Sequence, residues 1–175
     1  MTSAITRMQF LRGDIRGKKN IIRPPWSLPE DVFIETCSGC KKCIGSCPEK
    51  ILIKGRGNLP EVDFSQGECS FCGLCVEQCS DSALINYGGS SSPWRIKAQV
   101  KENCLTHQGI ICVTCQEQCE PGAIKMKHQL GMVAIPQINL TLCSGCGACF
   151  QPCPANAITL KSSELTVELS MGKKL

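Results

Sequence analysis

Short apolar pairs recur along this chain at a fixed distance from cysteines. They lie four and five residues after Cys47, Cys79, Cys119 and Cys153, and are Ile51-Leu52, Ala83-Leu84, Ala123-Ile124 and Ala157-Ile158. Between cysteine and pair, Pro48 and Pro154 suit the first turn of a helix, where a missing N–H costs nothing, and Ser80-Asp81 suits a capping position. The pattern predicts a short helix after each of these cysteines, leading into a short strand.

Two of these strands are predicted to be the first arm of a hairpin. Residues 51–53 lead through turn residues 55–58 to a second apolar run at 60–64. Residues 158–160 lead in the same way through 161–163 to 165–169. Glycine, asparagine and serine in the connecting segments favour turns. We therefore expect one hairpin in each half of the chain.

The run Gly-Gly-Ser-Ser-Ser-Pro at 88–93 marks the clearest internal boundary. At the other end, residues 1–23 hold six basic residues against one aspartate, a net charge of +5. We predict a basic N-terminal tail at 1–30, a first module at 31–88 and a second module at 94–175.

The chain holds 16 cysteines, all within four tight groups. Three groups have the spacing Cys-x2-Cys-x2-Cys-x3-Cys, and the third is stretched at its start to Cys-x7-Cys-x2-Cys-x3-Cys. The groups are Cys37, Cys40, Cys43 and Cys47; Cys69, Cys72, Cys75 and Cys79; Cys104, Cys112, Cys115 and Cys119; and Cys143, Cys146, Cys149 and Cys153.

This spacing is typical of ligands to [4Fe–4S] clusters. Three thiolates wrap one side of a cluster, and Gly39, Gly73, Gly145 and Gly147 let the loops approach closely. Zinc needs only two Cys-x2-Cys pairs, and cysteines this close together are poor disulfide staples. We therefore expect four [4Fe–4S] clusters per chain, each with four cysteine ligands.

In two-cluster ferredoxins the fourth cysteine of a group ligates the neighbouring cluster. Pairing group one with two, and three with four, predicts these ligand sets: Cys37, Cys40, Cys43 and Cys79; Cys69, Cys72, Cys75 and Cys47; Cys104, Cys112, Cys115 and Cys153; and Cys143, Cys146, Cys149 and Cys119. A nested pairing of one with four and two with three is the competing arrangement. The tandem version predicts an α+β fold, in which two bacterial ferredoxin-like modules of two clusters each follow an extended basic N-terminal tail.

The composition indicates that the packing of apolar side chains alone would stabilise this fold only weakly. The apolar share of 42% includes the cysteines, and aromatic residues are 5%. Metal binding then supplies folding free energy. Net charge is +4, but each loaded site adds about −2, which brings the protein to about −4. The basic isoelectric point is therefore no indication of nucleic-acid binding.

The chain shows no signal-peptide core and no stretch near the roughly 18 apolar residues that cross a bilayer, so we expect a soluble, cytoplasmic protein without membrane insertion. No nucleophile with a base, paired carboxylates or phosphate loop stands out, so we do not expect an enzyme. Trp26 and Trp94, each after a proline, are expected to anchor their segments on the modules.

Nearly the whole chain resembles the NapF family, the ferredoxin-type accessory proteins of the bacterial periplasmic nitrate reductase system. The resemblance lies in residues 7–13 (Arg-Met-Gln-Phe-Leu-Arg-Gly), 23–26 (Arg-Pro-Pro-Trp), 62–64 (Val-Asp-Phe), Pro93-Trp94 and the stretched third group. The chain departs from the family pattern at Met8, where a second arginine is common, and at Ser80, where a proline would follow the cysteine.

The resemblance implies a cytoplasmic iron–sulfur protein that binds the precursor of the nitrate reductase catalytic subunit before export and assists its maturation, by loading clusters or poising redox state. Two other functions stay open: an electron-transfer module that passes single electrons between redox partners, and a scaffold that donates iron–sulfur clusters.

Overall fold

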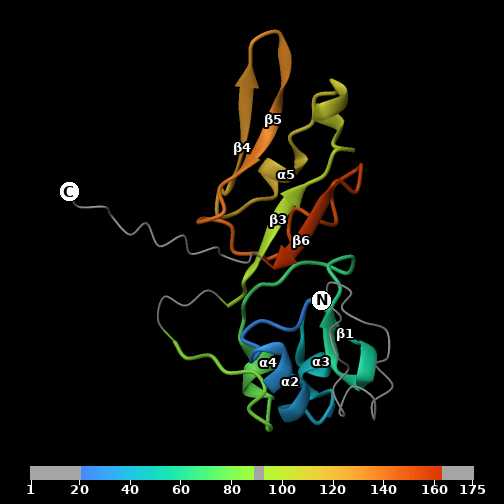
Figure 1. Ribbon diagram of the computed structural model, residues 1–175, viewed down its shortest axis with the longest axis vertical. Helices are drawn as coiled ribbons and strands as arrows, with labels where there is room; N and C mark the ends of the chain where they lie inside the picture. The colour runs from blue at the N-terminus through green and yellow to red at the C-terminus, as the bar shows by residue number, and fades with distance from the viewer. Residues whose placement is uncertain (1–20, 89–92, 163–175) are drawn as a thin grey trace, which may run out of the picture.

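A computed structural model describes residues 21–88 and 93–162, which form two halves at opposite ends of the long axis (Figure 1). The first half contains α2 (Glu30–Thr36), α3 (Lys42–Ser46), β1 (Leu52–Lys54), the 3-10 turn η1 (Arg56–Asn58), β2 (Pro60–Val62) and α4 (Leu74–Glu77). The second contains β3 (Ile96–Val100), the 3-10 turn η2 (Leu105–Gln108), α5 (Thr114–Glu117), β4 (Ile124–Gln129), β5 (Met132–Ile138) and β6 (Ile158–Ser162). This mixed content confirms the predicted α+β class. None of the helices described here has the length and apolar character to span a bilayer.

The strands form three antiparallel pairs, β1–β2, β3–β6 and β4–β5. The first hairpin is as predicted, with Leu52 opposite Val62 and η1 as its connection. The β4–β5 hairpin was not predicted, although Leu130-Gly131 separates two runs of strand length. Gly131 has a φ of 70°, which glycine adopts without strain.

The predicted hairpin at 158–169 is wrong in its turn. Strand β6 continues through Ser162, where a turn was expected, and pairs with β3, so that Ile96 lies opposite Ser162. The buried residues alternate along both strands, with Ile96 and Ala98 on β3 and Ile158 and Leu160 on β6. The pairing therefore gives each strand a shared apolar face. The expected partner strand at 165–169 lies outside the described residues.

The predicted helices after the last cysteine of each group are also wrong. Helices α3, α4 and α5 instead carry the third cysteine of groups one to three. After the last cysteine the chain makes a single turn that ends three residues on, at a residue with positive φ: Lys50, Ser82, Gly122 and Asn156. This left-handed residue stops helix growth and turns the apolar pair inward, where all four pairs are buried. Asp81 does not cap this turn; its carboxylate accepts hydrogen bonds from the Ser38 N–H and hydroxyl.

Residues 22–29 pack onto the first half, although the sequence places them in the tail. The N–H of Val62 donates to the Ile22 carbonyl at 2.8 Å, and Leu28 donates to Ala83 at 3.1 Å. Ser27 forms an isolated β-bridge with Leu84. Residues 22–29 therefore belong to the first half, because this segment completes its backbone pairing.

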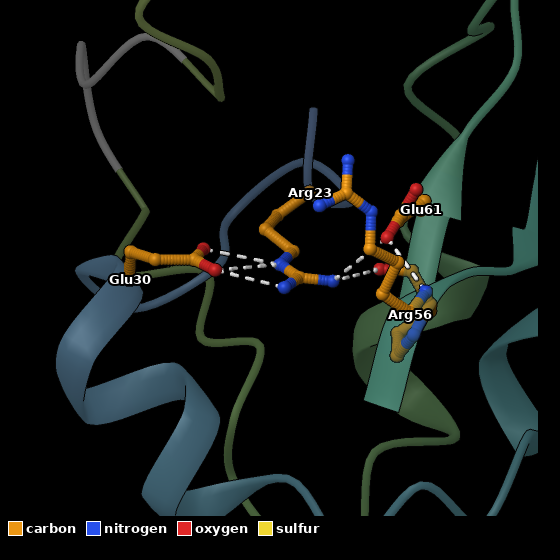
Figure 2. Close-up of polar contacts among 5 residues, drawn as sticks. Arg23, Glu30, Arg56 and Glu61 are labelled. Atoms are coloured by element: carbon orange, nitrogen blue, oxygen red, sulfur yellow. Dashed lines mark hydrogen bonds and ion pairs between the residues drawn. The ribbon is translucent and has the colours of Figure 1, made fainter. Parts of the chain in front are cut away.

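Arg23 links residues 22–29 to α2 and β2 through its side chain (Figure 2). Its guanidinium donates to the Glu30 carboxylate at 2.8 Å and to the Pro60 carbonyl at 3.1 Å, and lies 3.8 Å from the Glu61 carboxylate. It also lies over the ring of Phe33, 5.2 Å from its centroid. The side chain is buried, so its charge depends on these partners.

Five aromatic residues join the two halves; we call them the aromatic cluster: Trp26, Phe64, Phe71, Trp94 and Phe150. The rings of Phe64 and Trp94 are 5.6 Å apart, and Phe150 of the second half lies 6.3 Å from Phe64 of the first. The Trp94 indole donates to the Arg23 carbonyl at 3.0 Å. The predicted anchoring role of Trp26 and Trp94 is confirmed.

Arg23→Ala should lower the free energy of unfolding by about 2–3 kcal/mol, because it leaves Glu30 and the Pro60 carbonyl without their donor and removes the ion pair with Glu61. Chemical denaturation at equal iron content measures this. Lys54→Ala, a substitution on an exposed strand position, serves as the control. An equal change in both variants would contradict a structural role for Arg23.

Candidate metal centres

Four cavities each bring together four cysteines from two sequence groups. We call them the first site (Cys37, Cys40, Cys43, Cys79), the second site (Cys47, Cys69, Cys72, Cys75), the third site (Cys104, Cys112, Cys115, Cys153) and the fourth site (Cys119, Cys143, Cys146, Cys149). Counting the space at their mouths, their volumes are alike, from 320 to 350 Å³.

The cavities follow the tandem arrangement. In every site three thiols come from one group and the fourth is the last cysteine of the neighbouring group in the same half. A nested pairing would have placed Cys47 with the fourth group, whereas Cys47 lines the second site. All 16 cysteines found in the sequence thus lie in one of the four cavities.

Neighbouring backbone presses closely on the ligand loops. A Cβ on Gly39 would lie 2.8 Å from the carbonyl oxygen of Asn58, and one on Gly145 would lie 2.6 Å from that of Ile96. The amide of Asn58 also donates to the Gly39 carbonyl at 3.1 Å. Because these two glycines have no side chain, the backbone of η1 and of β3 can lie against the ligand loops. The sequence did not indicate this role.

Backbone N–H groups point at several of the thiols. Ala123 donates to the sulfur of Cys119 at 3.2 Å, and Ala157 donates to that of Cys153 at 3.2 Å. Both donors belong to the apolar pairs, which the left-handed turn brings back over the cysteine. N–H groups of this kind can complement the negative charge on a cysteine sulfur that ligates a cluster.

Burial opposes ionisation of five other thiols in the four sites. It raises the pKa of Cys43, Cys75 and Cys149 to about 12, and that of Cys69 and Cys115 to about 11. Repulsion from the neighbouring thiols of each site adds to the rise in the pKa. A bound cation must therefore displace protons from these sites, and its positive charge would offset both costs.

The donor sets fit a [4Fe–4S] cluster. Within residues 21–88 and 93–162, no three His, Cys, Asp or Glu side chains converge closely enough to hold a single metal ion; four thiols instead line the walls of each cavity. Four thiolates are the ligands of such clusters. A cluster held there would supply one-electron redox chemistry, and the chain's part is to hold it, shield it and set its potential.

The third site has two hydroxyl partners that the sequence reading missed. The hydroxyl of Thr106, a buried side chain in η2, lies 3.3 Å from the sulfur of Cys104. That of Thr114 lies 3.6 Å from the sulfur of Cys112. A Cys-x-Thr pattern at 104–106 and 112–114 was the available signal. His107 is exposed in the same loop and does not line the site.

Comparison with known proteins gives the class first. Two family models, each described as a 4Fe-4S dicluster domain, match residues 33–80 and 109–167. The chain is therefore a ferredoxin-type iron–sulfur protein built of two such domains, a class whose members are electron carriers, and no catalytic family is indicated. The second match begins after Cys104, so it leaves out the stretched start of group three.

Relatives then give the family. The chain is 40% identical over 154 residues to "Ferredoxin-type protein NapF" of Escherichia coli K12, covering 88% of this chain and 93% of that protein. It is 43% identical over 166 residues to the protein of the same name from Haemophilus influenzae, covering 89% and 93%. The chain belongs to the NapF family. A more distant relative, the methylamine utilization ferredoxin-type protein MauM of Methylophilus methylotrophus, is 26% identical over 174 residues, covering 87% and 74%.

Thr106→Val should lower the reduction potential of one cluster and leave iron content unchanged. A hydroxyl that donates to a ligand sulfur stabilises the more negative, reduced form, and valine removes the donor while keeping the shape. A redox titration followed by electron paramagnetic resonance (EPR) tests this. Thr36→Val, which removes a hydroxyl bonded within α2, is the matched control. The same set of potentials in both variants would contradict the role of Thr106.

Proposed function

We propose that this protein holds four [4Fe–4S] clusters, one in each site, with the four cysteines of each site as ligands. The observation that supports this most directly is the grouping of all 16 thiols into four alike cavities. The two dicluster domains point to the same cluster type. The chain is then a redox protein and not an enzyme in its own right.

Membership of the NapF family extends this proposal to a biological role. The protein assists maturation of the catalytic subunit of periplasmic nitrate reductase, acting in the cytoplasm on the precursor before its export. Redox poising is the favoured mode of assistance, because each site shares ligands between two groups and a cluster could leave only by opening both. Donation of clusters is the less favoured alternative for that reason.

Transfer of single electrons between redox partners is the second candidate function. One observation favours it. The two halves, each with two sites, meet at ligand loops, where the backbone N–H of Cys69 donates to the carbonyl of Cys146 at 2.8 Å. The maturation role and electron transfer differ in whether one particular partner is bound.

Protein purified without oxygen should contain about 16 iron and 16 sulfide per chain, four of each for every site. Iron and acid-labile sulfide assays on the full chain measure this directly. Stoichiometric zinc with little iron would refute the cluster proposal.

Cys47→Ala tests the sharing of ligands. Cys47 belongs to group one in sequence but lines the second site, so its loss should damage the same cluster as Cys72→Ala. Both variants should lose about a quarter of the iron and show the same remaining EPR spectrum. Cys40→Ala, which removes a first-site thiol, should show a different one. A spectrum of Cys47→Ala that matches Cys40→Ala would overturn the assignment.

Deleting residues 2–20 should leave iron content unchanged and weaken capture of the nitrate reductase precursor. The segment holds no cysteine and carries five basic residues against one acidic, or +4, so its attraction should weaken with salt. The cut stops short of Ile22 and Arg23, which hold the first half together. A full-length variant with Arg7, Arg12, Arg16, Lys18 and Lys19 changed to glutamine separates charge from length. Undiminished capture by both variants at low salt would rule out a docking role for the tail.

A further inference from the structure

Resting on the proposed cluster content, we propose that the four sites form one continuous electron path in the order first, second, fourth, third. The path crosses between the halves where the loop of Cys69 meets the loop of Cys146. The order along the molecule therefore differs from the order along the sequence, and the third site, which follows the linker, lies at the far end.

The junction between the halves joins the second and fourth sites directly. The N–H of Cys69, a second-site thiol, donates to the carbonyl of Cys146, a fourth-site thiol, at 2.8 Å. Only one peptide hydrogen bond thus separates the ligand loops of two sites from different halves.

Packing at the junction brings the two loops this close. Gly147 follows Cys146 with a φ of 91°, and a Cβ there would lie 2.1 Å from the Phe64 ring of the first half. Phe64 is buried between Trp94 and Phe150 in the aromatic cluster. Because Gly147 has no side chain, the aromatic cluster can hold the loop of Cys146 against the loop of Cys69.

Within each half the two sites are neighbours because they exchange their fourth ligands. In the first half, the Ser46 hydroxyl on α3 also donates to the Leu74 carbonyl on α4 at 3.5 Å. In the second half, Cys119 of the third group lines the fourth site and Cys153 of the fourth group lines the third. The first and third sites are thereby left at the two ends of the path.

Each step along the path is a one-electron exchange in which the giving site is oxidised by one electron and the receiving site reduced by one. No bond forms or breaks, and dithionite supplies the electrons in the experiment below. Two reduced clusters in neighbouring sites also broaden each other's EPR signals, because their unpaired spins interact. That interaction reports the order of the sites without any measurement of activity.

Four double variants of the full chain, each without the first two cysteines of one group, test the order: Cys37→Ala/Cys40→Ala, Cys69→Ala/Cys72→Ala, Cys104→Ala/Cys112→Ala and Cys143→Ala/Cys146→Ala. After reduction with dithionite, loss of the second site should leave the first cluster as a separate, unbroadened signal. Loss of the fourth site should isolate the third cluster in the same way. Loss of the first or third site should isolate none, because the remaining three stay contiguous.

The outcomes separate this inference from the proposed function. A wild-type protein without about 16 iron atoms would refute the cluster content itself. Full iron with an isolated signal after loss of the first or third site, or with none after loss of the second or fourth, would refute only the order.

A second pair of variants alters no ligand and covers the case in which a double variant fails to fold. Gly147→Ala drives a Cβ into Phe64, whereas Gly131→Ala, in the turn between β4 and β5 with a φ of 70°, meets no protein atom within 4 Å and lies outside all four sites. With equal iron content, Gly147→Ala should show less broadening, as expected of two separate pairs of clusters, and Gly131→Ala should keep the wild-type spectrum. Equal broadening in both variants would contradict the junction.

Discussion

In each site the fourth thiol comes from the neighbouring cysteine group, and the rest of the fold depends on this exchange. To deliver that thiol, each group ends in a single turn, stopped by a left-handed residue three positions after its last cysteine. The same turn directs the apolar pair into the core and, in groups three and four, aims an alanine N–H at the cysteine sulfur. Ligand placement and core packing are thus two results of one local conformation.

Two sets of contacts outside the ligand groups join distant parts of the chain. The aromatic cluster joins the halves, and Arg23 binds the segment before α2 to β2 through a buried, fully paired charge. A chain with so few aromatic residues has little apolar surface to bury elsewhere. Its stability therefore rests on these contacts together with metal binding, which contributes folding free energy when the ligands are otherwise dispersed.

Features set by local spacing could be read from the sequence, and those set by distant partners could not. The grouping of the cysteines, the apolar pairs and the first hairpin follow from cysteine intervals and turn residues that lie close together in the chain. The helices were misplaced because Lys50, Ser82 and Asn156 adopt positive φ, which their identities do not announce. The pairing of β3 with β6 joins segments about sixty residues apart. Arg23 looked like one more charge of a basic tail, because Glu30 and Glu61 approach it only in the fold.

The exchange of fourth thiols also fixes when each site can first exist during synthesis of the chain. Cys37, Cys40 and Cys43 are made first, yet their cavity is closed only by Cys79, after Cys75 has already completed the second site. In the other half, Cys149 completes the fourth site before Cys153 closes the third. Within each half, the site nearer the junction is therefore complete before the outer one, so each half becomes ready for its iron from the junction outwards.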